Sequence, residues 1–452
     1  MNAETTETSV SPPTTKQIRR AVLASTIGTT VEWYDFALFG TASALVFNRL
    51  FFPDLDPLFG TVAAFAISAV GFFVRPLGGF VFGIVGDKYG RRSVLIITLA
   101  LMGTATVCMG LLPTYAQIGL WAPTLLILLR ALQGFGSGAE FAGAVIMVAE
   151  YAPPKYRTLL SSFPVMGNML GGALGAGFFS LLSTLLSHEQ MTSWGWRVPF
   201  FVGALGLAVG MWVRYGLEET PKFRAMQKKA DKKQEEKRTP LRVVFKKYPK
   251  QMAAAMLSVF AESAPSYLIK TFTITYLASF LLVDERIGLN AVTIASLVGI
   301  FTTPMFGFLG DRYGAKKVYM IAIVAMVAMI FPFFLLIGTK LPVVITLAVI
   351  VIYGFGVRAL GANLGLIISG YFPTEVRYSG CAISKEIATA LSGGVSPMIA
   401  TGLLAWSQSF VPVAIYIIAV CIVSFLALLL GPKNQWADKE VVEEEKKELA
   451  AV

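Results

Sequence analysis

The chain has 452 residues, of which 55% are hydrophobic and 14% are charged, and its formal net charge at pH 7 is +11. Its mean hydropathy is +0.67, so the composition excludes an ordinary soluble globular protein. We therefore interpret the chain as a membrane protein.

Twelve segments are long and apolar enough to cross a membrane as helices. A bilayer core about 30 Å thick requires roughly 20 mainly apolar residues. In chain order, the segments of the first half are 21–48, 58–84, 93–113, 122–150, 158–186 and 196–217. Those of the second half are 250–282, 288–309, 318–338, 341–370, 379–405 and 408–431. The sequence therefore predicts an all-α membrane protein with twelve transmembrane helices.

The positions of Lys and Arg predict the orientation of these helices. With the N-terminus in the cytoplasm, 28 of the 38 basic residues fall in the two tails and the inner loops, 4 in the outer loops and 6 within helices. Basic residues concentrate on the cytoplasmic side of membrane proteins. We therefore place both termini in the cytoplasm and expect a multi-pass protein of the plasma membrane, in a bacterium the cytoplasmic membrane. The positive charge then reflects topology and does not indicate a nucleic-acid partner.

A long polar interval divides the helices six and six, and the two halves repeat each other. We place an N-terminal tail at 1–20, a first bundle at 21–217, a linker at 218–249, a second bundle at 250–431 and a C-terminal tail at 432–452. GIVGDKYGRR begins at Gly83 and GFLGDRYGAKK at Gly307, so Asp87 and Asp311 lie 224 positions apart. QGFG matches YGFG, and the patterns Tyr-x-Pro-x-x-x-Arg at 151 and 371 match each other, both at 220 positions. Three matches in order imply two related six-helix bundles.

Motifs in both halves resemble a known family. The pattern Gly, three residues, Asp, a basic residue, one residue and Gly resembles the loop between helices two and three of the major facilitator superfamily. Arg130, Gln133 and the glycines at 134, 136 and 138 resemble its fourth-helix motif. EWYDF, RPLGG, GAEFAGA, GWRVPF and LEETPKF resemble its metabolite:proton symporter branch, which carries compounds such as proline, betaine, shikimate, 2-oxoglutarate and citrate. The resemblance implies two pseudo-symmetric bundles and secondary active transport by alternating access.

The repeated loop is a candidate gate. Asp87 stands where one helix ends on the cytoplasmic side and the next begins, so its carboxylate can cap amide groups of a helix N-terminus and pair with Arg91 or Arg92. Gly83 and Gly90 allow close helix approach and a tight turn. A structural cap in a basic loop is the alternative, but two copies in corresponding places favour gating. The candidate gating residues are Gly83, Asp87, Gly90, Arg91, Arg92, Gly307, Asp311 and Gly314.

Ionisable residues inside membrane helices are costly and usually face a bundle interior or a water-filled cavity. Most of those here lie on helices one, four, seven and ten, which line the central cavity in the superfamily that the chain resembles. They are Glu32, Asp35, Arg130, Glu140, Glu262, Lys270 and Arg358. The exceptions, on other helices, are Arg75, Arg214, Lys385 and Glu386.

Asp35, Glu32 and Arg130 are the candidates for proton coupling. At 1.5 Å per residue, Asp35 lies roughly 22 Å from the inner end of helix one and Arg130 roughly 10 Å from the outer end of helix four, so the two levels nearly coincide. A buried acid near an arginine is suited to take up and release a proton. Glu32 shares a helix face with Asp35, so either acid can be the carrier. The alternative is a fixed ion pair that holds helices one and four together.

Arg358 and Lys270 are the main candidates for substrate binding. Both fall near the midplane, and two cations there suit a carboxylate, which arginine can bind through two hydrogen bonds. The alternative for Lys270 is charge balancing by Glu262, two turns earlier on the same helix.

Three further residues are weaker candidates for substrate binding. Gln133 and Asn363 can add polar contacts, but polar residues also hold membrane helices together. Tyr34 can join Trp33, Tyr267 and Tyr276 in a cage for a quaternary ammonium group, although aromatic residues in membrane helices more often serve packing.

Other activities find less support in the sequence. Tyr34 and Asp35 match half of the active-site pattern of intramembrane aspartyl proteases, but the Gly-x-Gly-Asp half does not occur. The three cysteines are widely spaced and His188 is the only histidine, so we predict no metal site, no cofactor and no enzyme activity. We predict a proton symporter that imports a small carboxylated metabolite, for which a monomer suffices. The alternatives are uptake of a zwitterionic osmolyte such as proline or betaine, and a non-transporting receptor on the same scaffold.

Overall fold

The computed structural model describes residues 13–55, 57–216, 218–220, 223 and 240–432. Nearly all of the predicted C-terminal tail, the first twelve residues of the predicted N-terminal tail and most of the predicted linker lie outside the described residues. The described residues form helices and their connections, without any β-strand.

Six helical spans make up the first half. They are α1 (Thr15–Ala42) with η1 (Ser43–Phe47) and α2 (Asn48–Phe51); α3 (Pro57–Tyr89); α4 (Arg91–Leu111); α6 (Trp121–Ser137) with α7 (Glu140–Tyr151); α8 (Arg157–Leu185); and α10 (Val198–Tyr215). The short helices of the connections are α5 (Tyr115–Ile118), η2 (Pro154–Tyr156), α9 (His188–Ser193) and η3 (Gly195–Arg197).

Six further spans make up the second half, after the short helix α12 (Pro240–Lys247). They are α13 (Pro249–Tyr267) with η4 (Leu268–Phe272), α14 (Thr273–Thr275) and η5 (Tyr276–Phe280); α15 (Glu285–Tyr313); α16 (Ala315–Gly338); α17 (Pro342–Val349) with η6 (Ile350–Val357) and α18 (Arg358–Ser369); α19 (Arg377–Thr389) with η7 (Ala390–Gly394) and α20 (Ser396–Ser407); and α21 (Val411–Leu430).

The all-α prediction is confirmed, since a helical span occupies each of the twelve predicted segments. Among the described residues, eleven helices are long and apolar enough to cross a membrane by length and composition. The first span, which carries Glu32 and Asp35, is less apolar than these eleven. It also begins at Thr15, earlier than the predicted residue 21, because Thr14 and Gln17 form a capping box: each side chain accepts a hydrogen bond from the backbone amide of the other residue.

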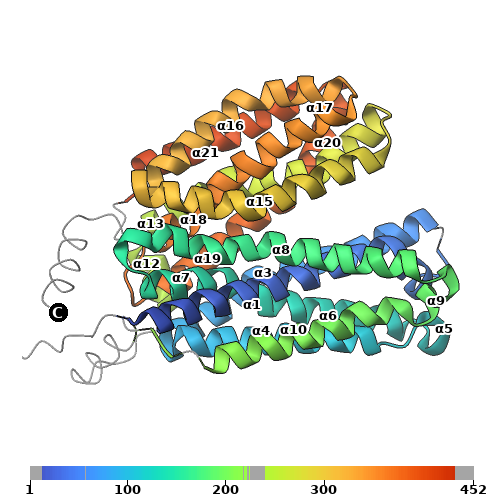
Figure 1. Ribbon diagram of the computed structural model, residues 1–452, viewed down its shortest axis with the longest axis horizontal. Helices are drawn as coiled ribbons and strands as arrows, with labels where there is room; N and C mark the ends of the chain where they lie inside the picture. Colours follow the sequence, from blue (N-terminus) through green and yellow to red (C-terminus); the bar gives the residue numbers. More distant parts are fainter. Residues whose placement is uncertain (1–12, 56, 217, 221–222, 224–239, 433–452) are drawn as a thin grey trace, which may run out of the picture.

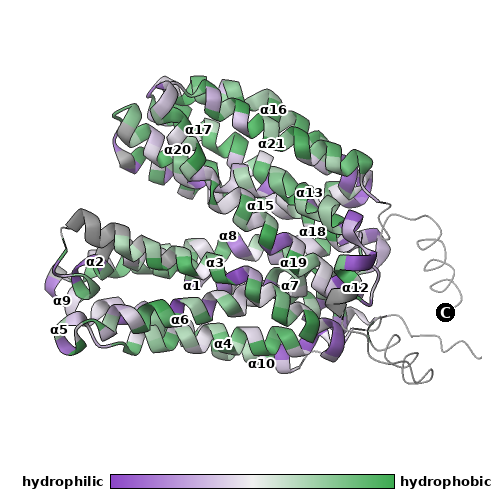
Figure 2. Cartoon of the chain, turned by 180° about the vertical axis from the view of Figure 1, so that it is seen from behind, coloured by the Kyte–Doolittle hydropathy of each residue, from purple (hydrophilic) through white to green (hydrophobic). Residues whose placement is uncertain are grey.

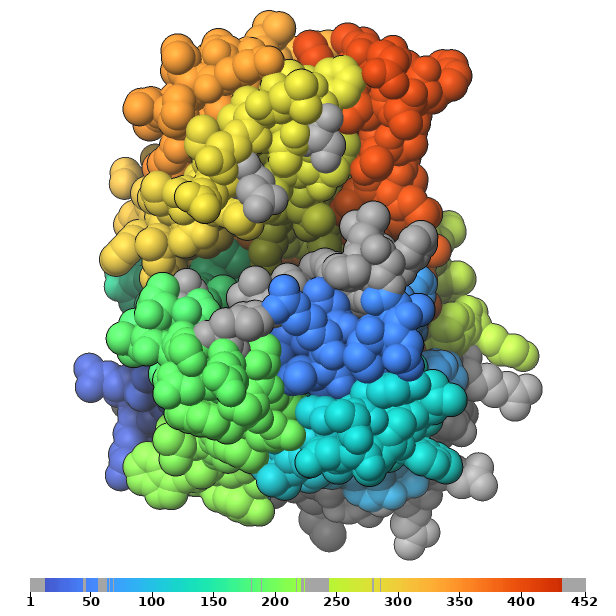
Figure 3. Space-filling model, turned by 90° about the vertical axis from the view of Figure 1, so that its right-hand side faces the viewer, coloured from blue at the N-terminus to red at the C-terminus, as the bar shows by residue number. Residues whose placement is uncertain are grey.

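The two halves lie side by side, meet at one end and diverge toward the other (Figure 1). We call the end with Thr14 and α12 the inner end, which the basic residues predict to face the cytoplasm, and the opposite end, with α5 and α9, the outer end. Across the halves α3 packs against α19 and α8 against α15. Figure 3, which looks onto the outer end, shows a surface hollowed between the two halves.

The outer flanks of both bundles are apolar, and polar residues gather at the two ends of the helices (Figure 2). Large hydrophobic side chains such as Trp212 (77% exposed) and Phe301 (77% exposed) lie on these flanks. In a bilayer such side chains contact lipid instead of water, which explains an exposure that a soluble protein would avoid.

Glycines position the helix that carries the two acidic candidates. A Cβ atom added to Gly167 of α8 would lie 2.7 Å from the carbonyl oxygen of Thr26, and one added to Gly175 would lie 2.5 Å from that of Tyr34. Small residues let membrane helices approach until their backbones touch. The glycines therefore place α1 directly against α8 and orient Glu32 and Asp35 toward the other helices.

Candidate functional site

Asp35 is buried and is linked to Arg130 through two intervening side chains. The Thr106 hydroxyl of α4 donates to Asp35 Oδ2 at 2.7 Å, and Gln133 Nε2 of α6 donates to Thr106 Oγ1 at 2.7 Å. Arg130 in turn donates to Gln133 Oε1. The two charges lie near each other as the sequence predicts, but this hydrogen-bond chain takes the place of a direct ion pair.

The Arg130 guanidinium has an unusual environment for a buried cation. Its side chain is fully buried, and its Nε and Nη2 atoms have no hydrogen-bond partner. Two aromatic rings of α1 supply part of the missing stabilisation, because the guanidinium carbon lies 4.4 Å from the ring centroid of Phe36 and 4.3 Å from that of Phe39. The positive charge is thus held beside Asp35 by packing and one hydrogen bond.

Glu32 has different partners from Asp35, although both lie on α1. Its Oε1 atom lies 3.3 Å from Arg75 Nη2 of α3. Arg75 also binds Glu386 of α19, with 2.8 Å from Nε to Oε2 and 3.3 Å from Nη2 to Oε1. Arg75 and Glu386 were absent from the predicted site because their helices are not expected to line the cavity. Their charge inside a predicted span was the signal that could have included them.

Two other ion pairs lie within single halves, the first of them buried and the second half-buried. Glu140 of α7 pairs with Arg214 of α10, and the Thr98 hydroxyl donates to Glu140 Oε2 at 3.0 Å. In the second half Glu262 Oε2 lies 3.1 Å from the ammonium nitrogen of Lys385. The alternative prediction, that Glu262 neutralises Lys270, is therefore wrong. The π-helical segment η4 begins at Leu268 and changes the helical register before Lys270.

Lys270 and Arg358 occupy contrasting positions. Lys270 is exposed, and its ammonium nitrogen lies 5.7 Å from the ring centroid of Trp33, which belongs to the other half. Arg358 is only 2% exposed and donates one hydrogen bond of 3.4 Å to the Ser266 hydroxyl. Its guanidinium carbon lies 4.8 Å from the ring centroid of Tyr353. Its Nε has no hydrogen-bond partner, and within the described residues no ion pair with an acid neutralises its charge.

The polar candidates Tyr34 and Asn363 each donate a hydrogen bond to a backbone carbonyl of a neighbouring helix, and Asn363 also donates to one within its own helix. The Tyr34 hydroxyl donates to the carbonyl of Pro199 at 2.7 Å. Asn363 Nδ2 donates to the carbonyls of Ala359 at 2.9 Å and Phe306 at 3.4 Å. The bonds to Pro199 and Phe306 join two helices, which is the structural alternative that the sequence left open for Asn363.

Of the four aromatic residues that could form a cage, only Trp33 and Tyr267 belong to the same series of ring contacts, which runs through Phe36 and Phe72. Trp33 packs against Phe36, while Tyr267 meets Phe72 across the two halves with ring centroids 6.0 Å apart. Tyr276 stacks on Phe272 and Phe280 inside the second half. Only Trp33 and Tyr267 therefore lie near the contact between the halves.

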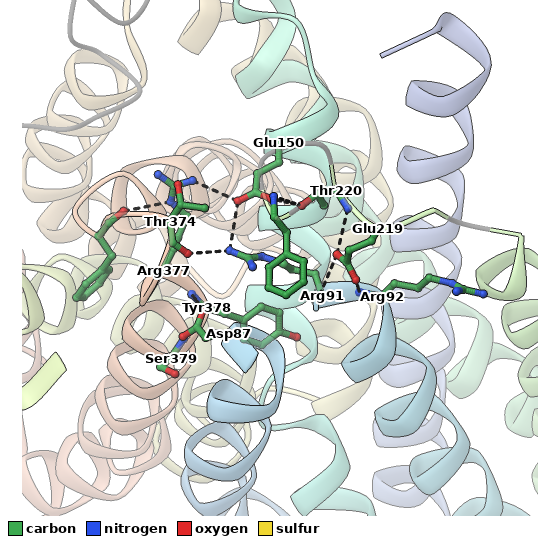
Figure 4. A network of polar contacts seen from close by, with 12 residues as sticks. Asp87, Arg91, Arg92, Glu150, Glu219, Thr220, Thr374, Arg377, Tyr378 and Ser379 are labelled. Carbon is green, nitrogen blue, oxygen red and sulfur yellow. Dashed lines mark hydrogen bonds and ion pairs between the residues drawn. The ribbon is translucent and has the colours of Figure 1, made fainter. Parts of the chain in front are cut away.

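The repeated aspartates cap helices of the opposite half. Asp87 Oδ1 and Oδ2 accept hydrogen bonds from the backbone amides of Tyr378 at 3.1 Å and Ser379 at 2.9 Å, in the first turn of α19 (Figure 4). Asp311 accepts from the amides of Thr158 at 2.7 Å and Leu159 at 2.9 Å, in the first turn of α8. The prediction of a helix cap is correct in kind, but the capped helix belongs to the other bundle and not to the adjoining helix.

Glycines allow this reciprocal contact. A Cβ atom on Gly83 would lie 3.0 Å from the Cα atom of Ser379, and one on Gly307 would lie 3.0 Å from that of Leu159. The two turn glycines have positive φ values, 100° at Gly90 and 93° at Gly314, which favour glycine. The pseudo-symmetry of the sequence repeat thus reappears as two matching contacts between the halves.

Arg91 and Arg92 do not form an ion pair with Asp87, and the structure corrects that prediction. Their backbone amides donate to Glu219 Oε1 at 3.0 Å and Oε2 at 3.1 Å, so Glu219 is the residue that caps α4. Burial raises the pKa of the Glu219 carboxyl above its ordinary value. The Arg91 side chain instead crosses to the carbonyl of Thr374 at 2.9 Å, and that of Arg92 donates to Tyr215.

Glu150 is a buried carboxylate that joins the halves at the inner end (Figure 4). Its Oε1 lies 3.2 Å from Arg377 Nη1 of the second half and 3.6 Å from Arg91 Nη2 of the first. Sequence reasoning did not include Glu150 or Glu219 among the site residues. Glu219 lies inside the LEETPKF motif, and Glu150 directly precedes the repeated Tyr-x-Pro pattern. These positions could have marked both residues as candidates.

The arrangement closes the inner end with polar contacts and leaves the outer end hollowed. Helix caps and ion pairs at the inner end can break and re-form without covalent change, and the buried charges lie between the two ends. Among the described residues no group of three or more His, Cys, Asp or Glu side chains could hold a metal ion. The geometry therefore suits a pathway whose access alternates between the two faces.

Comparisons with known proteins agree on one family. The family model described as "Sugar (and other) transporter" matches residues 21–283, and that described as "Major Facilitator Superfamily" matches residues 252–451. The chain is 35% identical to the shikimate transporter of Escherichia coli (strain K12), covering 93% of this chain and 95% of that protein. It is also 35% identical to the proline/betaine transporter of Salmonella typhimurium, covering 91% of this chain and 82% of that protein.

Solved structures share the fold at low sequence identity. The proton:xylose symporter XylE bound to 6-bromo-6-deoxy-D-glucose is similar with a TM-score of 0.76 and 16% identity, covering 95% of this chain and 99% of that chain. The inward open conformation of the xylose transporter XylE from E. coli is similar with a TM-score of 0.61 and 17% identity, over the same shares.

Proposed function

This chain belongs to the major facilitator superfamily, and on that premise we propose that it imports a small carboxylated metabolite together with protons across the cytoplasmic membrane. The proposal assigns it transport and no chemical conversion. Its relatives at 35% identity are transporters of shikimate and of proline or betaine, all of which are small molecules that carry a carboxylate. Within this function we assign roles to Arg358 and Lys270, to the acids of α1, and to Asp87 and Asp311.

The observation that carries the carboxylate assignment is the environment of Arg358. A guanidinium buried in a membrane span is costly unless an acid or a bound anion lies beside it. The described residues supply Arg358 with one hydroxyl hydrogen bond and one aromatic ring, but with no acid. The substrate carboxylate is the anion that completes this site, and Lys270 adds a second positive charge near the hollow between the halves.

Proton coupling is assigned to the buried acids of α1. Asp35 is connected to Arg130 by hydrogen bonds through Thr106 and Gln133. A proton on Asp35 would remove its negative charge and so weaken this chain of hydrogen bonds. Such a change can alter the position of α6 relative to α1, and hence the exposure of the site. Glu32 is the second candidate for the carrier.

Gating is assigned to the two reciprocal aspartate caps. Asp87 and Asp311 each hold the first turn of a helix in the opposite half. Opening the inner end requires that the four hydrogen bonds break, and closing it restores them. The caps therefore set the balance between the two conformations without touching the substrate.

Uptake of zwitterionic osmolytes is the second candidate function. Proline and betaine also present a carboxylate to Arg358, and relatives at 35% identity transport them. Trp33 and Tyr267 lie near the contact between the halves and can face a cationic group. The two functions differ in whether the substrate must carry a positive charge.

The test is uptake into proteoliposomes of labelled carboxylates, including shikimate, and of proline and betaine, with and without a pH gradient. We expect accumulation of at least one carboxylate when the interior is alkaline, and its collapse with a protonophore. Arg358→Gln should weaken substrate binding roughly ten- to hundredfold, because it removes a charged hydrogen bond of about 1.5 to 3 kcal/mol. Arg286→Gln, at an exposed site at the outer end of α15, is the matched control.

Three results would contradict this assignment. If no compound accumulates under any gradient, proton-driven import is wrong. If only betaine and proline are transported, the osmolyte function replaces that of a general carboxylate importer. If folded Arg358→Gln protein binds substrate as tightly as the parent, Arg358 is a structural counter-ion and does not contact the carboxylate.

A further inference from the structure

Three buried charged side chains from three helices meet where the two halves pack. Arg75 of α3 lies 3.3 Å from Glu32 of α1 and 2.8 Å from Glu386 of α19, and the three side chains are 8%, 1% and 4% exposed. Arg75 stands fourteen residues before the inner end of α3, which is about 21 Å along the helix. The rings of Phe36 and Phe72 flank the guanidinium at 5.3 and 6.0 Å. We refer to Glu32, Arg75 and Glu386 as the triad.

The charged neighbours of the triad in the first half are balanced among themselves. The other charges that act on Glu32 are Glu140 and Arg214, which form an ion pair with each other. Arg130 also acts on Arg75, but its charge is matched by Asp35 through the hydrogen-bond chain described above. Neither pair supplies a cation to the triad.

The second half does not supply one either. Lys385 precedes Glu386 in the sequence, but its ammonium group is bound to Glu262 at 3.1 Å. Tyr267 is the remaining titratable group that acts on Arg75, and a tyrosine carries no positive charge. The triad therefore holds two carboxylates for one guanidinium, in a region where excess charge is costly.

One proton would remove this excess, and the hydrogen bonds indicate which carboxylate takes it. Glu386 accepts two hydrogen bonds from Arg75. Glu32 Oε1 accepts none, although Arg75 Nη2 lies 3.3 Å away. Hydrogen bonds to the ionised form of an acid stabilise that form, so Glu386 stays ionised and Glu32 takes up the proton.

We propose that Arg75 couples proton release to the separation of the two halves by exchanging its ion-pair partner from Glu386 to Glu32. This inference rests on the proposed proton symport. In the conformation described here the inner end is closed, Arg75 binds Glu386 of the opposite half, and Glu32 holds a proton. When α3 and α19 separate, Arg75 loses Glu386 and pairs with Glu32. The proton then leaves the Glu32 carboxyl for water on the inner side.

The exchange explains why an arginine bridges the halves at this depth. When Glu32 is protonated, the Arg75 guanidinium pairs with Glu386 alone. This pairing strengthens the contact between α3 and α19. An ionised Glu32 competes for the guanidinium and weakens that contact. Arg75 is thus a positioning residue, because it binds neither the substrate nor the transported proton.

The test compares gradient-driven accumulation with exchange at equal pH in proteoliposomes. In Glu386→Gln, Arg75 pairs with Glu32 in every conformation, so the ratio of accumulation to exchange should fall about tenfold or more. Glu32→Gln should lower the ratio equally, and both variants should lose the pH dependence of exchange. Because the residues act as one unit, the double variant should lose no more than either single variant.

Tyr319→Phe is the matched control, since it removes a buried hydrogen bond from α16 to the carbonyl of Ser258 in α13, outside the triad, and should keep the ratio. If Glu386→Gln does not fold, Arg75→Lys replaces it, because lysine keeps the charge without the fork that binds two carboxylates. Substrate exchange by Arg75→Lys should show a shifted pH profile.

Two outcomes separate this inference from the proposed function. Suppose that the unmodified protein accumulates a substrate under a pH gradient and that Glu386→Gln keeps the same ratio and pH profile. The change of ion-pair partner at Arg75 is then refuted, while proton symport stands. If the unmodified protein accumulates no substrate, the proposed function fails and the inference fails with it.

Discussion

Asp87→Asn should shift the protein toward the conformation that is open at the inner end. Asp87 accepts two backbone hydrogen bonds from α19 of the opposite half. Asparagine is nearly isosteric, but its single carbonyl oxygen replaces two charged acceptors, and its amide group faces an amide donor. A hydrogen bond to a charged group is worth about 1.5 to 3 kcal/mol and a neutral one about 1 kcal/mol. We therefore expect the closed inner end to lose about 2 kcal/mol, or roughly thirtyfold in the conformational equilibrium.

The assay measures the fraction of protein that is open at the inner end, from the labelling rate of a cysteine introduced near the inner end of α3, together with substrate turnover and binding. The labelling rate should rise and turnover should fall, while binding changes less. Asp311→Asn should act in the same direction but more weakly. Only the first copy has an arginine, Arg91, that also crosses to the other half; the second copy has Ala315 at that position.

Asp284→Asn is the matched control for this experiment. Asp284 caps α15 by accepting from the amide of Arg286 at 2.9 Å, so it is a helix cap within one half. It should change neither labelling nor turnover by more than about twofold, since a cap within one half contributes equally to both conformations. If Asp87→Asn labels like the parent, or if binding weakens as much as turnover, the gating role of the reciprocal caps is refuted.

Two further predictions concern the coupling and the α4 cap. Asp35→Asn should abolish accumulation driven by a pH gradient and leave substrate exchange measurable. Thr106→Val should reduce accumulation less, because it breaks the link to Gln133 but keeps the acid. Full accumulation in Asp35→Asn would exclude Asp35 as the proton carrier. Burial raises the pKa of Glu219 above its ordinary value of 4.5, so its contribution to stability is present below pH 4.5 and is lost as the pH rises through the raised pKa. Melting curves of Glu219→Gln should lack that decline, and an unchanged pH dependence would contradict it.

The architecture could be read from the sequence because it follows from local chemistry. Apolar runs of sufficient length predict membrane helices, and the matching loops at Gly83 and Gly307 predict two related bundles. The largest boundary error lies at the start of the first helix, where one capping pair decides the boundary. Thr14 and Gln17 extend α1 beyond the apolar run. Hydropathy does not predict this extension, because the capping residues are polar.

Partner choice was decided only by the tertiary structure. The sequence shows that Asp87 follows one helix and precedes another, but the amides that it binds belong to α19, nearly three hundred residues later. Glu262 pairs with Lys385 instead of Lys270 because a π-helical segment changes the register between them. Glu32 and Asp35 are three residues apart, yet they belong to separate polar clusters.

The sequence by itself therefore determined which residues carry charge inside the membrane, since any such charge stands out against apolar neighbours. It could not determine which charges meet, because an ion pair depends on the packing and rotation of helices that are distant in the chain. Arg75 illustrates the difference. Its position in a predicted span marks it as costly, but only the contact of α3 with α19 brings it between the carboxylates of the two halves.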